Sequence, residues 1–291
     1  MKVGIYPDCT NEDYHANPAI SRSGIMMFNK SPYKFWAHYL NPNRPHKEST
    51  KVMEFGSAFH TFVLEPDLFH DTYCLEPAYE QLPTKVLLKN VGRPLYEAYK
   101  LEKSKIDYIN EVRKQEHEER VAEKGKIVLS LNDYHILQSM RTAITSHTEA
   151  SSLIEKAKYE QSYFWQDKES GLYVKSRPDI LHDNMIVDLK TCASASSRAY
   201  QRVMLDSGYH IQGAMCREGV RIVEGRDIPN VINVCVEKTY PYQIGIKIIS
   251  EEALAEGHRV FKDSLMRMAE CFDKNEWPSY EVETVDLPKW Y

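Results

Sequence analysis

Apolar residues recur at helical spacing through much of the first 150 residues. Short helices are predicted after Ser21 and after Ser31, because a hydroxyl residue that can cap a helix is followed there by apolar positions. A third helix is predicted from Phe55 to the stop at Pro66, and a fourth after Ser130. The segment 100–126 differs, with seven acidic and eight basic residues among its 27. That composition is typical of a solvated helix with many salt bridges.

After residue 150 the pattern changes to short strands separated by turns. Strands are predicted over 159–165, 172–181, 185–191, 231–236 and 242–249, and helices over 196–205, 209–218 and 251–274. An extended, aromatic tail follows the last helix. Alternating strands and helices predict an α/β fold. We expect one domain over 1–291, with a mainly helical part (1–150), a sheet with its helices (151–250), and a final helix and tail (251–291).

Composition agrees with a folded protein of ordinary type. The 291 residues are 42% hydrophobic and 27% charged, which excludes wholesale disorder. The formal net charge of −5 neither supports nor excludes nucleic-acid binding, because one groove can be basic on an acidic protein. The chain has no apolar run long enough for a membrane span, and it does not begin like a signal peptide. We therefore expect a soluble, cytoplasmic protein.

The six cysteines are widely scattered and form no C-x-x-C pair. This spacing argues against a zinc ribbon and against a dense disulfide framework, and buried, reduced thiols are the default expectation. An iron–sulfur cluster held by well-separated cysteines stays open as a minor alternative.

Two carboxylates on a predicted hairpin carry the clearest chemistry. If Asp183 and Asn184 form a two-residue turn, Asp179 lies opposite Asp188, with Cβ atoms about 4.5–5.5 Å apart. Two carboxylates so close would repel each other or share a proton unless they held a cation such as Mg²⁺. Lys190 lies on the same face of the strand as Asp188, where its ammonium group can orient water or neutralise developing charge.

Each of these residues also has a plainer interpretation. A D-x-K triplet is common in surface salt bridges, His60 is more often a core histidine than a ligand, and Glu160 could be an ordinary strand-end carboxylate. On the two helices that follow, Tyr209 and Gln212 share one face, as do Arg198 and Arg202. The two arginines could grip phosphates, and all four side chains could equally belong to solvated or packed helix surfaces.

Taken together, the motifs resemble the PD-(D/E)xK nuclease superfamily, and in particular its RecB-like branch and the RecE (exonuclease VIII) nucleases of phage type. The resemblance rests on Pro178-Asp179 with Asp188-Leu189-Lys190, on Gly56 to His60, and on Tyr209-x-x-Gln212. Further segments extend it from about Tyr6 to Trp290. It implies a restriction-endonuclease-like core, a mixed central sheet flanked by helices, with a helical N-terminal subdomain. One position departs from the pattern: Cys216 stands where relatives usually have a tyrosine.

The resemblance also implies a function. It predicts a Mg²⁺-dependent exonuclease, with Mn²⁺ as a substitute, that degrades one strand of linear duplex DNA from its 5′ end. The 3′ single strand would pass to a RecT-type annealing protein for recombination, and the enzyme would form a homo-oligomeric ring, a tetramer being favoured. His60, Asp179, Asp188 and the Leu189 carbonyl would hold metal, and Lys190 would be the catalytic lysine. Glu160 would be a further acidic residue near the metals, and Tyr209 and Gln212 would line the site or contact DNA.

Two other functions remain open on the sequence. One is a nuclease of the same fold that acts on single-stranded or flap DNA. The other is a DNA-binding or assembly protein that has lost hydrolysis. The complete set of His60, Asp179, Asp188 and Lys190 argues against the second, because a degenerate site usually loses one member first.

Overall fold

The computed structural model describes residues 2–45, 49–78 and 93–287, and it divides into two compact units. The first unit combines Met1–Thr50 with Ala143–Tyr291, and the second is Lys51–Thr142.

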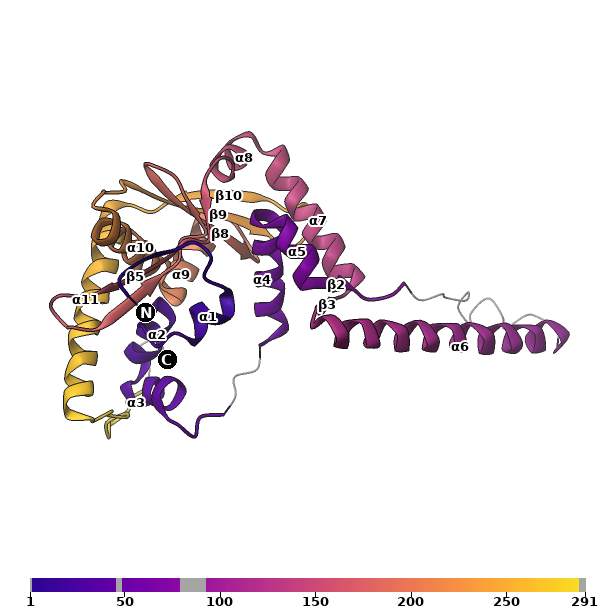
Figure 1. Cartoon of the computed structure of the whole chain (residues 1–291), viewed down its shortest axis with the longest axis horizontal. Coiled ribbons are helices and arrows are strands. Elements are labelled where there is room, and N and C mark those ends of the chain that lie inside the picture. The colour runs from indigo at the N-terminus through magenta and orange to yellow at the C-terminus, as the bar shows by residue number, and fades with distance from the viewer. Residues whose placement is uncertain (1, 46–48, 79–92, 288–291) are drawn as a thin grey trace. The chain divides into compact units, whose positions relative to one another are not determined.

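The first unit contains two sheets (Figure 1). A three-stranded antiparallel sheet has the order β1 (Gly4–Tyr6), β5 (Ser162–Gln166), β6 (Tyr173–Ser176). A five-stranded sheet has the order β10 (Ile244–Ile248), β9 (Asn230–Glu237), β8 (Met185–Cys192), β7 (Ile180–Leu181), β4 (Lys158–Tyr159). Strands β8 and β9 are parallel and the other neighbours are antiparallel, so this sheet is mixed, as predicted.

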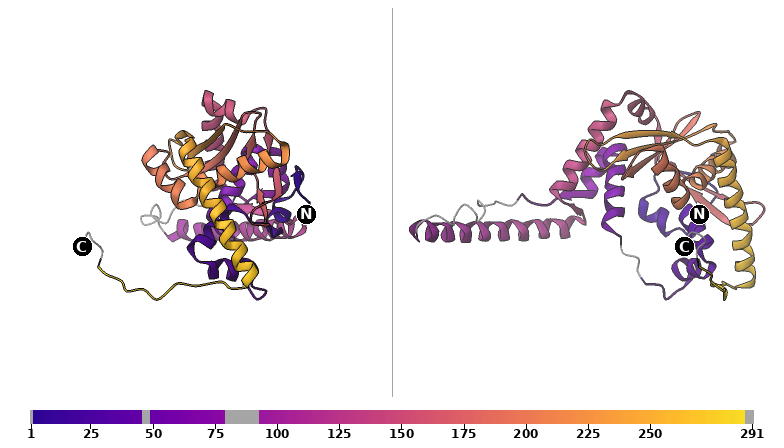
Figure 2. Two further views of the ribbon diagram at one scale, coloured as in Figure 1. Left: turned by 90° about the vertical axis from the view of Figure 1, so that its left-hand side faces the viewer. Right: turned by 180° about the vertical axis from the view of Figure 1, so that it is seen from behind.

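Helices connect and cover these strands. They are α1 (Asn11–Ala16), α2 (Arg22–Lys30), α3 (Pro32–Phe35), a π-helical turn η1 (Trp36–Leu40), α8 (Thr148–Ile154), α9 (Ser197–Ser207), α10 (Tyr209–Glu224) and α11 (Glu251–Lys274). The parallel pair β8 and β9 requires a crossover, which α9 and α10 provide. Gly208, in the left-handed conformation, separates these two helices where the sequence predicted a break. An extended tail over 276–287 follows α11 (Figure 2).

The core of the first unit lies where α10 crosses β5 and packs beside α11. Trp165 of β5 is completely buried there. Two glycines, one on α10 and one on α11, allow α10 to lie close to β5 and to α11. A Cβ on Gly219 would lie 2.9 Å from Trp165, and one on Gly257 would lie 2.4 Å from the His210 carbonyl oxygen. Larger residues at these positions would push the helices away from the strand and from each other.

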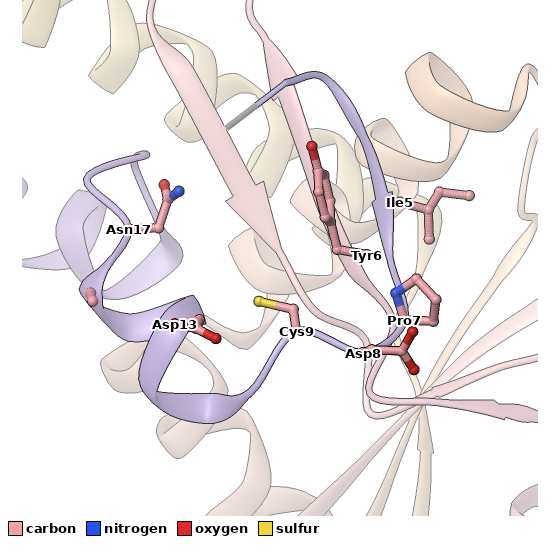
Figure 3. Close-up of a pocket in the computed structure, with 8 residues that line it drawn as sticks. Ile5, Tyr6, Pro7, Asp8, Cys9, Asp13 and Asn17 are labelled. Carbon is pink, nitrogen blue, oxygen red and sulfur yellow. The ribbon is translucent and has the colours of Figure 1, made fainter.

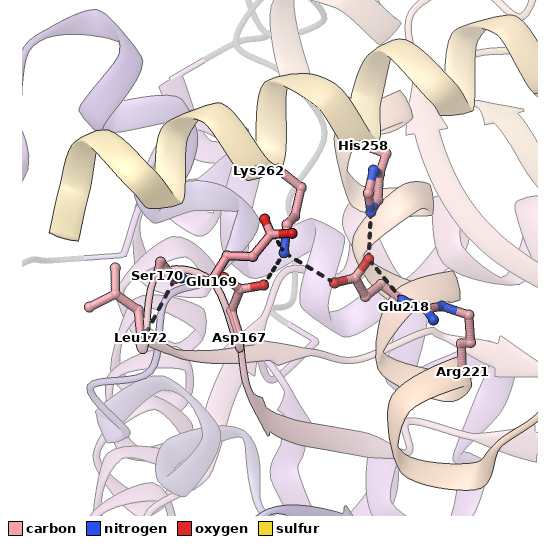
Figure 4. A network of polar contacts seen from close by, with 8 residues as sticks. All are labelled: Asp167, Glu169, Ser170, Leu172, Glu218, Arg221, His258 and Lys262. Carbon is pink, nitrogen blue, oxygen red and sulfur yellow. Dashed lines mark hydrogen bonds and ion pairs between the residues drawn. The ribbon is translucent and has the colours of Figure 1, made fainter.

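A buried ion-pair network joins the β5–β6 turn to α10 and α11 (Figure 4). Lys262 of α11 pairs with Asp167 in the turn and lies 3.8 Å from Glu218 of α10. His258 contacts the other oxygen of Glu218 at 2.5 Å. Asp167 also accepts bonds from the Ser170 backbone and hydroxyl, so its buried carboxylate is fully engaged. The network fixes three elements of the unit to one another.

The second unit contains α4 (Lys51–Leu64), α5 (Pro66–Thr72), β2 (Tyr73–Leu75), the long helix α6 (Arg93–Lys124), β3 (Ile127–Leu129) and most of α7 (Leu131–Ser146). Strands β2 and β3 pair in parallel. An aromatic cluster of Phe62, Phe69, Tyr73 and Tyr134 packs α4, α5, β2 and α7 together, with ring centroids 4.8–6.3 Å apart. The charged segment forms a helix, as predicted.

Several predicted elements differ in extent. The strand expected over 159–165 is interrupted at Glu160, whose φ of 48° breaks the ladder. The strand expected over 172–181 divides into β6 and β7 at Arg177 to Asp179. Pro66, expected only to end a helix, also begins α5, because proline is well tolerated in the first turn. Among the described residues, no helix combines the length and apolar character that a membrane crossing requires.

Candidate active site

The hairpin of β7 and β8 has the register that the sequence predicted. Ile180 pairs with Val187 and Leu181 with Ile186, and the His182 N–H donates to the Met185 carbonyl at 2.9 Å. This closes the turn around Asp183 and Asn184. Asp179 directly precedes β7 and Asp188 lies within β8, and both carboxylates are buried.

Asp179 is held by backbone on both sides. Its Oδ2 accepts a hydrogen bond from the Leu189 N–H at 2.7 Å, and its carbonyl accepts one from the Glu160 N–H at 3.0 Å. These bonds bring the side chain of Glu160 to the same place, with a carboxylate oxygen within 4.8 Å of one from Asp179. The left-handed backbone at Glu160, which interrupts the strand, accompanies this arrangement.

Asp188, Lys190 and Gln212 form a second group beside the first. Lys190 pairs with Oδ2 of Asp188, and the Gln212 amide donates to Oδ1 at 2.7 Å. The Lys190 ammonium lies 3.4 Å from the Gln212 carbonyl oxygen. Gln212 is in the first turn of α10, the second helix of the crossover, and its hydrogen bond places it beside Asp188 of β8. One glutamine thus orients both the carboxylate and the lysine.

Lys190 remains charged in this setting. Burial alone would lower its pKa, but the carboxylates of Asp188 and Asp179 and the Tyr209 hydroxyl raise the pKa above its ordinary value. The ammonium also lies 4.8 Å from the centre of the Tyr209 ring. The protonated amine is therefore suited to stabilise negative charge, not to accept a proton.

The structure adds residues that sequence reasoning missed. Asn233 of β9 is the register partner of Asp188 and is 2% exposed, and its amide nitrogen has no hydrogen-bond partner. The Tyr200 hydroxyl is likewise buried without a partner, and the ring lies 6.4 Å from that of Tyr209. The sequence does offer a clue to Asn233, because it is a polar residue within the apolar run Val231 to Val236.

Cys216, at the position where the sequence pattern departs, is buried beneath the site. Burial raises the pKa of its thiol to about 12, with a further contribution from Asp188. A thiol with so high a pKa is protonated near pH 7 and is a poor nucleophile.

The other predicted residues lie on α9, on β8 and on α4. Arg198 and Arg202 are exposed on α9, where Arg202 pairs loosely with Asp206 at 3.8 Å. Leu189 itself is fully buried, so its side chain belongs to the core. His60 is half-buried on α4 of the second unit.

A separate pocket of about 540 Å³ lies along the N-terminal segment (Figure 3). Its lining comes from Ile5 to Cys9 and from α1 with the residue after it, and it includes none of the predicted site residues. Its carboxylate Asp13 accepts a bond from Thr10 in a local helix cap. We assign it no chemistry.

The donor set suits a hard divalent cation. Asp179, Asp188 and Glu160 supply carboxylate oxygens, and two of them are buried, where charge needs compensation. Among the described residues of the first unit, Lys190 is the cation paired with Asp188. Carboxylates gathered this closely repel one another unless a cation lies between them.

Comparison with known families agrees with this geometry. Residues 21–288 match the family model described as "PDDEXK-like domain of unknown function (DUF3799)". The chain belongs to this family. The PDDEXK-like domain thus includes every predicted site residue, and the predicted PD-(D/E)xK fold class is confirmed.

One solved structure is similar to this PDDEXK-like protein over nearly its whole length. It is the crystal structure of a protein from Eubacterium rectale described as a "putative exonuclease". The TM-score is 0.60 at 17% sequence identity, and the match covers 96% of this chain and 95% of the other. At that identity the likeness shows the fold alone. No curated protein matches the chain.

Proposed function

We propose that this PDDEXK-like protein is a Mg²⁺-dependent exodeoxyribonuclease that degrades linear double-stranded DNA in the 5′ to 3′ direction. The single observation that carries the proposal is the group of Asp179, Asp188, Lys190 and Gln212 on the β7–β8 hairpin and α10. A buried aspartate pair with an adjacent lysine is costly to maintain unless it serves hydrolysis of a charged substrate.

Asp179, Asp188 and the Leu189 carbonyl would hold the metal, with Glu160 beside them. His60 is proposed as a further ligand from the second unit, on the strength of the sequence resemblance. A bound divalent cation would polarise the phosphate and lower the pKa of an attacking water. The suitability of the carboxylate oxygens for Mg²⁺ supports this choice, and Mn²⁺ would substitute.

The chain's own residues would have distinct roles. Lys190 would stabilise the charge that develops on the phosphate and orient the attacking water, since its raised pKa keeps it protonated. Gln212 would keep Asp188 and Lys190 in place through its two polar contacts. Tyr209 would line the site beside Lys190, and Arg198 and Arg202 would contact the DNA backbone from the exposed face of α9.

The wider setting is proposed from the sequence resemblance. The 3′ single strand left by digestion would serve recombination by strand annealing, with a RecT-type protein as partner. A homo-oligomeric ring, with a tetramer favoured, would enclose the DNA.

End-labelled DNA tests the proposed reaction. Linear duplex carrying a 5′ or a 3′ label is incubated with the full chain in Mg²⁺ or EDTA, beside Asp188→Asn and Lys190→Ala. We expect Mg²⁺-dependent release of the 5′ label, and a loss of at least about 100-fold in both variants, because Asp188→Asn weakens the proposed metal site and Lys190→Ala removes charge stabilisation at the reacting phosphate. Lys168→Ala, which removes an exposed lysine from the β5–β6 turn, is the matched control and should behave like the wild type.

Other substrates complete the design. Covalently closed circular duplex should resist digestion if the activity is exonucleolytic. Faster cleavage of single-stranded or flap DNA would replace the proposed substrate with the alternative one. DNA binding without cleavage under any divalent metal would contradict the enzyme assignment.

A further inference from the structure

The turn between β9 and β10 presents an exposed aromatic side chain on an anchored backbone. Tyr240 is 87% exposed, the highest value among the tyrosine, phenylalanine and tryptophan residues that the structure describes. The backbone around it is fixed, since the Tyr242 N–H donates to the Thr239 carbonyl at 2.7 Å. The ring of Tyr242 meets that of Tyr240 edge-on at 6.5 Å. An aromatic ring held in solvent by an ordered turn is available to stack on a flat ligand.

This turn lies at the same edge of the sheet as the proposed catalytic lysine. Strands β8 and β9 are parallel and Lys190 pairs with Cys235, so their carboxyl ends coincide. Directly beyond them, the Lys238 N–H donates to the Cys192 carbonyl at 3.1 Å. Tyr240 follows two residues later, which places it within about 20 Å of Lys190 by strand and chain geometry. That is the span of about six base steps of B-form DNA.

Basic residues lie around Cys192 and the start of α9, next to this turn. Burial and Glu237 raise the pKa of the Cys192 thiol, and the positive charges of Lys238 and Lys247 nearby partly offset that rise. Lys247 also reaches the Ser197 hydroxyl at 3.3 Å, at the start of α9, and the next residue is the exposed Arg198. Glu237 is the acidic neighbour, and its carboxylate is engaged by the Ala195 N–H at 2.8 Å. Basic residues at the same edge of the sheet as an exposed aromatic ring suit a polyanion with flat, unpaired bases.

We propose that Tyr240 stacks on an unpaired base of the DNA, while Lys238, Lys247 and Arg198 hold the adjacent phosphates. The inference rests on the proposed nuclease function and extends it: the site would take DNA with a single-stranded or frayed segment within about six nucleotides of the scissile phosphate. Base-paired DNA does not expose a base face except at its ends, so the contact would discriminate between paired and unpaired substrate.

Equilibrium binding in Ca²⁺, chosen to limit cleavage, tests this proposal with the full-length chain. The probes are a duplex with a single-stranded overhang and a dumbbell duplex closed at both ends, each also made with 2-aminopurine at successive positions. We expect Tyr240→Leu to weaken binding to the overhang duplex by about 5- to 150-fold, which is the range for loss of one stacked base. Dumbbell binding should change less than about twofold. The wild type should quench 2-aminopurine at one or two adjacent overhang positions, and Tyr240→Leu should not.

Matched variants separate stacking from other effects. Tyr240→Phe keeps the ring and should retain affinity and quenching. Tyr108→Leu removes another exposed tyrosine, on α6, and should bind like the wild type. Lys238→Gln should weaken binding to both probes and lower the salt dependence by about one counterion.

The outcomes distinguish this inference from the function on which it rests. Wild-type cleavage in Mg²⁺ together with unchanged affinity and quenching in Tyr240→Leu would overturn the stacking role alone. Equal weakening on both probes would also overturn it, as would loss of self-association without loss of DNA binding. A wild type that neither binds nor cleaves DNA would overturn the proposed function and this inference together.

Discussion

At the scale of single residues, the site is organised around Asp188. One of its carboxylate oxygens pairs with Lys190, and the other accepts a hydrogen bond from Gln212. The carboxylate is therefore held in one orientation. The same glutamine approaches the lysine, which makes it a positioning residue for both partners. The D-x-K motif therefore depends on a side chain from a helix that begins nineteen residues after Lys190 in the sequence.

Removing this glutamine should impair catalysis more than folding. We expect Gln212→Leu to lower kcat by about 10- to 100-fold and to raise the Mg²⁺ concentration needed for half-maximal rate, as is typical for groups that orient metal ligands. Rates measured across a Mg²⁺ titration, with thermal unfolding in parallel, check this. Gln138→Leu, on the exposed face of α7, is the control. A Gln212→Leu variant with wild-type rates at every Mg²⁺ concentration would show that Asp188 needs no such support.

At the scale of elements, the caps decide which boundaries the sequence could predict. Helix α11 runs over Glu251–Lys274, as predicted, because Ser250 caps its start and Asn275 ends it in the left-handed conformation. Helix α10 continues to Glu224, well past the predicted end at Glu218. Its second half has buried polar and small residues, Glu218 and Gly219, that interrupt an apolar pattern. Tertiary contacts explain both residues. Glu218 takes part in the ion-pair network of Lys262, and Gly219 leaves room for the Trp165 ring.

That network should make stability depend on pH in the acid range. Burial would raise the pKa of Asp167, but Lys262 and Ser170 bring it below its ordinary value of 3.8. The same holds for Glu218, where burial is outweighed by His258, Lys262 and Arg221, against an ordinary value of 4.5. Carboxyl groups with lowered pKa values add stability that is complete above the ordinary value and lost as the pH falls through the lowered one.

Lys262→Met tests the network. At pH 7 we expect it to lower the free energy of unfolding by about 3–5 kcal/mol, because it leaves the Asp167 carboxylate buried without its cation. The difference from the wild type should shrink as the pH falls below the ordinary value of 3.8, because protonation removes the charge of the buried carboxylate. Urea unfolding at several pH values measures both effects, with Lys274→Met at the exposed end of α11 as the control. An equal loss at pH 7 and pH 3 would rule out the electrostatic explanation.

At the scale of the whole molecule, contacts between distant segments complete the first unit. Arg177 donates to the Ser162 hydroxyl, the Asn11 side chain and the Cys9 carbonyl, each at 2.8 Å, and it lies 4.2 Å from the Tyr14 ring centre. Residues near position 10 are thereby joined to the segment directly before Asp179. The N-terminal strand β1 pairs with β5 in the same region, so the N-terminal segment supports the strands that precede the hairpin.

Arg177→Met should therefore release the N-terminal segment. We expect the free energy of unfolding to fall by about 1–3 kcal/mol, since the buried Ser162 hydroxyl and the part-buried Cys9 carbonyl lose their partner. Limited proteolysis should cut near residues 8–17 earlier than in the wild type, and mass spectrometry would locate the cut. Arg259→Met is the matched control, because its ion pairs on α11 are solvent-exposed and no measurable loss is expected. Unchanged proteolysis of Arg177→Met would show that β1 holds the segment without the arginine.

The sequence by itself determined the local structure and the chemistry of the hairpin. The turn at Asp183-Asn184 sets the pairing of β7 with β8, and strand alternation then places Asp188 and Lys190 on one face, so the carboxylate pair followed from spacing alone. Tertiary structure decided what surrounds that pair. The positive φ at Glu160, the approach of Gln212 and the position of Asn233 opposite Asp188 depend on the crossover and on pairing between strands about 45 residues apart. Local patterns do not encode such contacts, because they form only when the whole sheet and its covering helices pack.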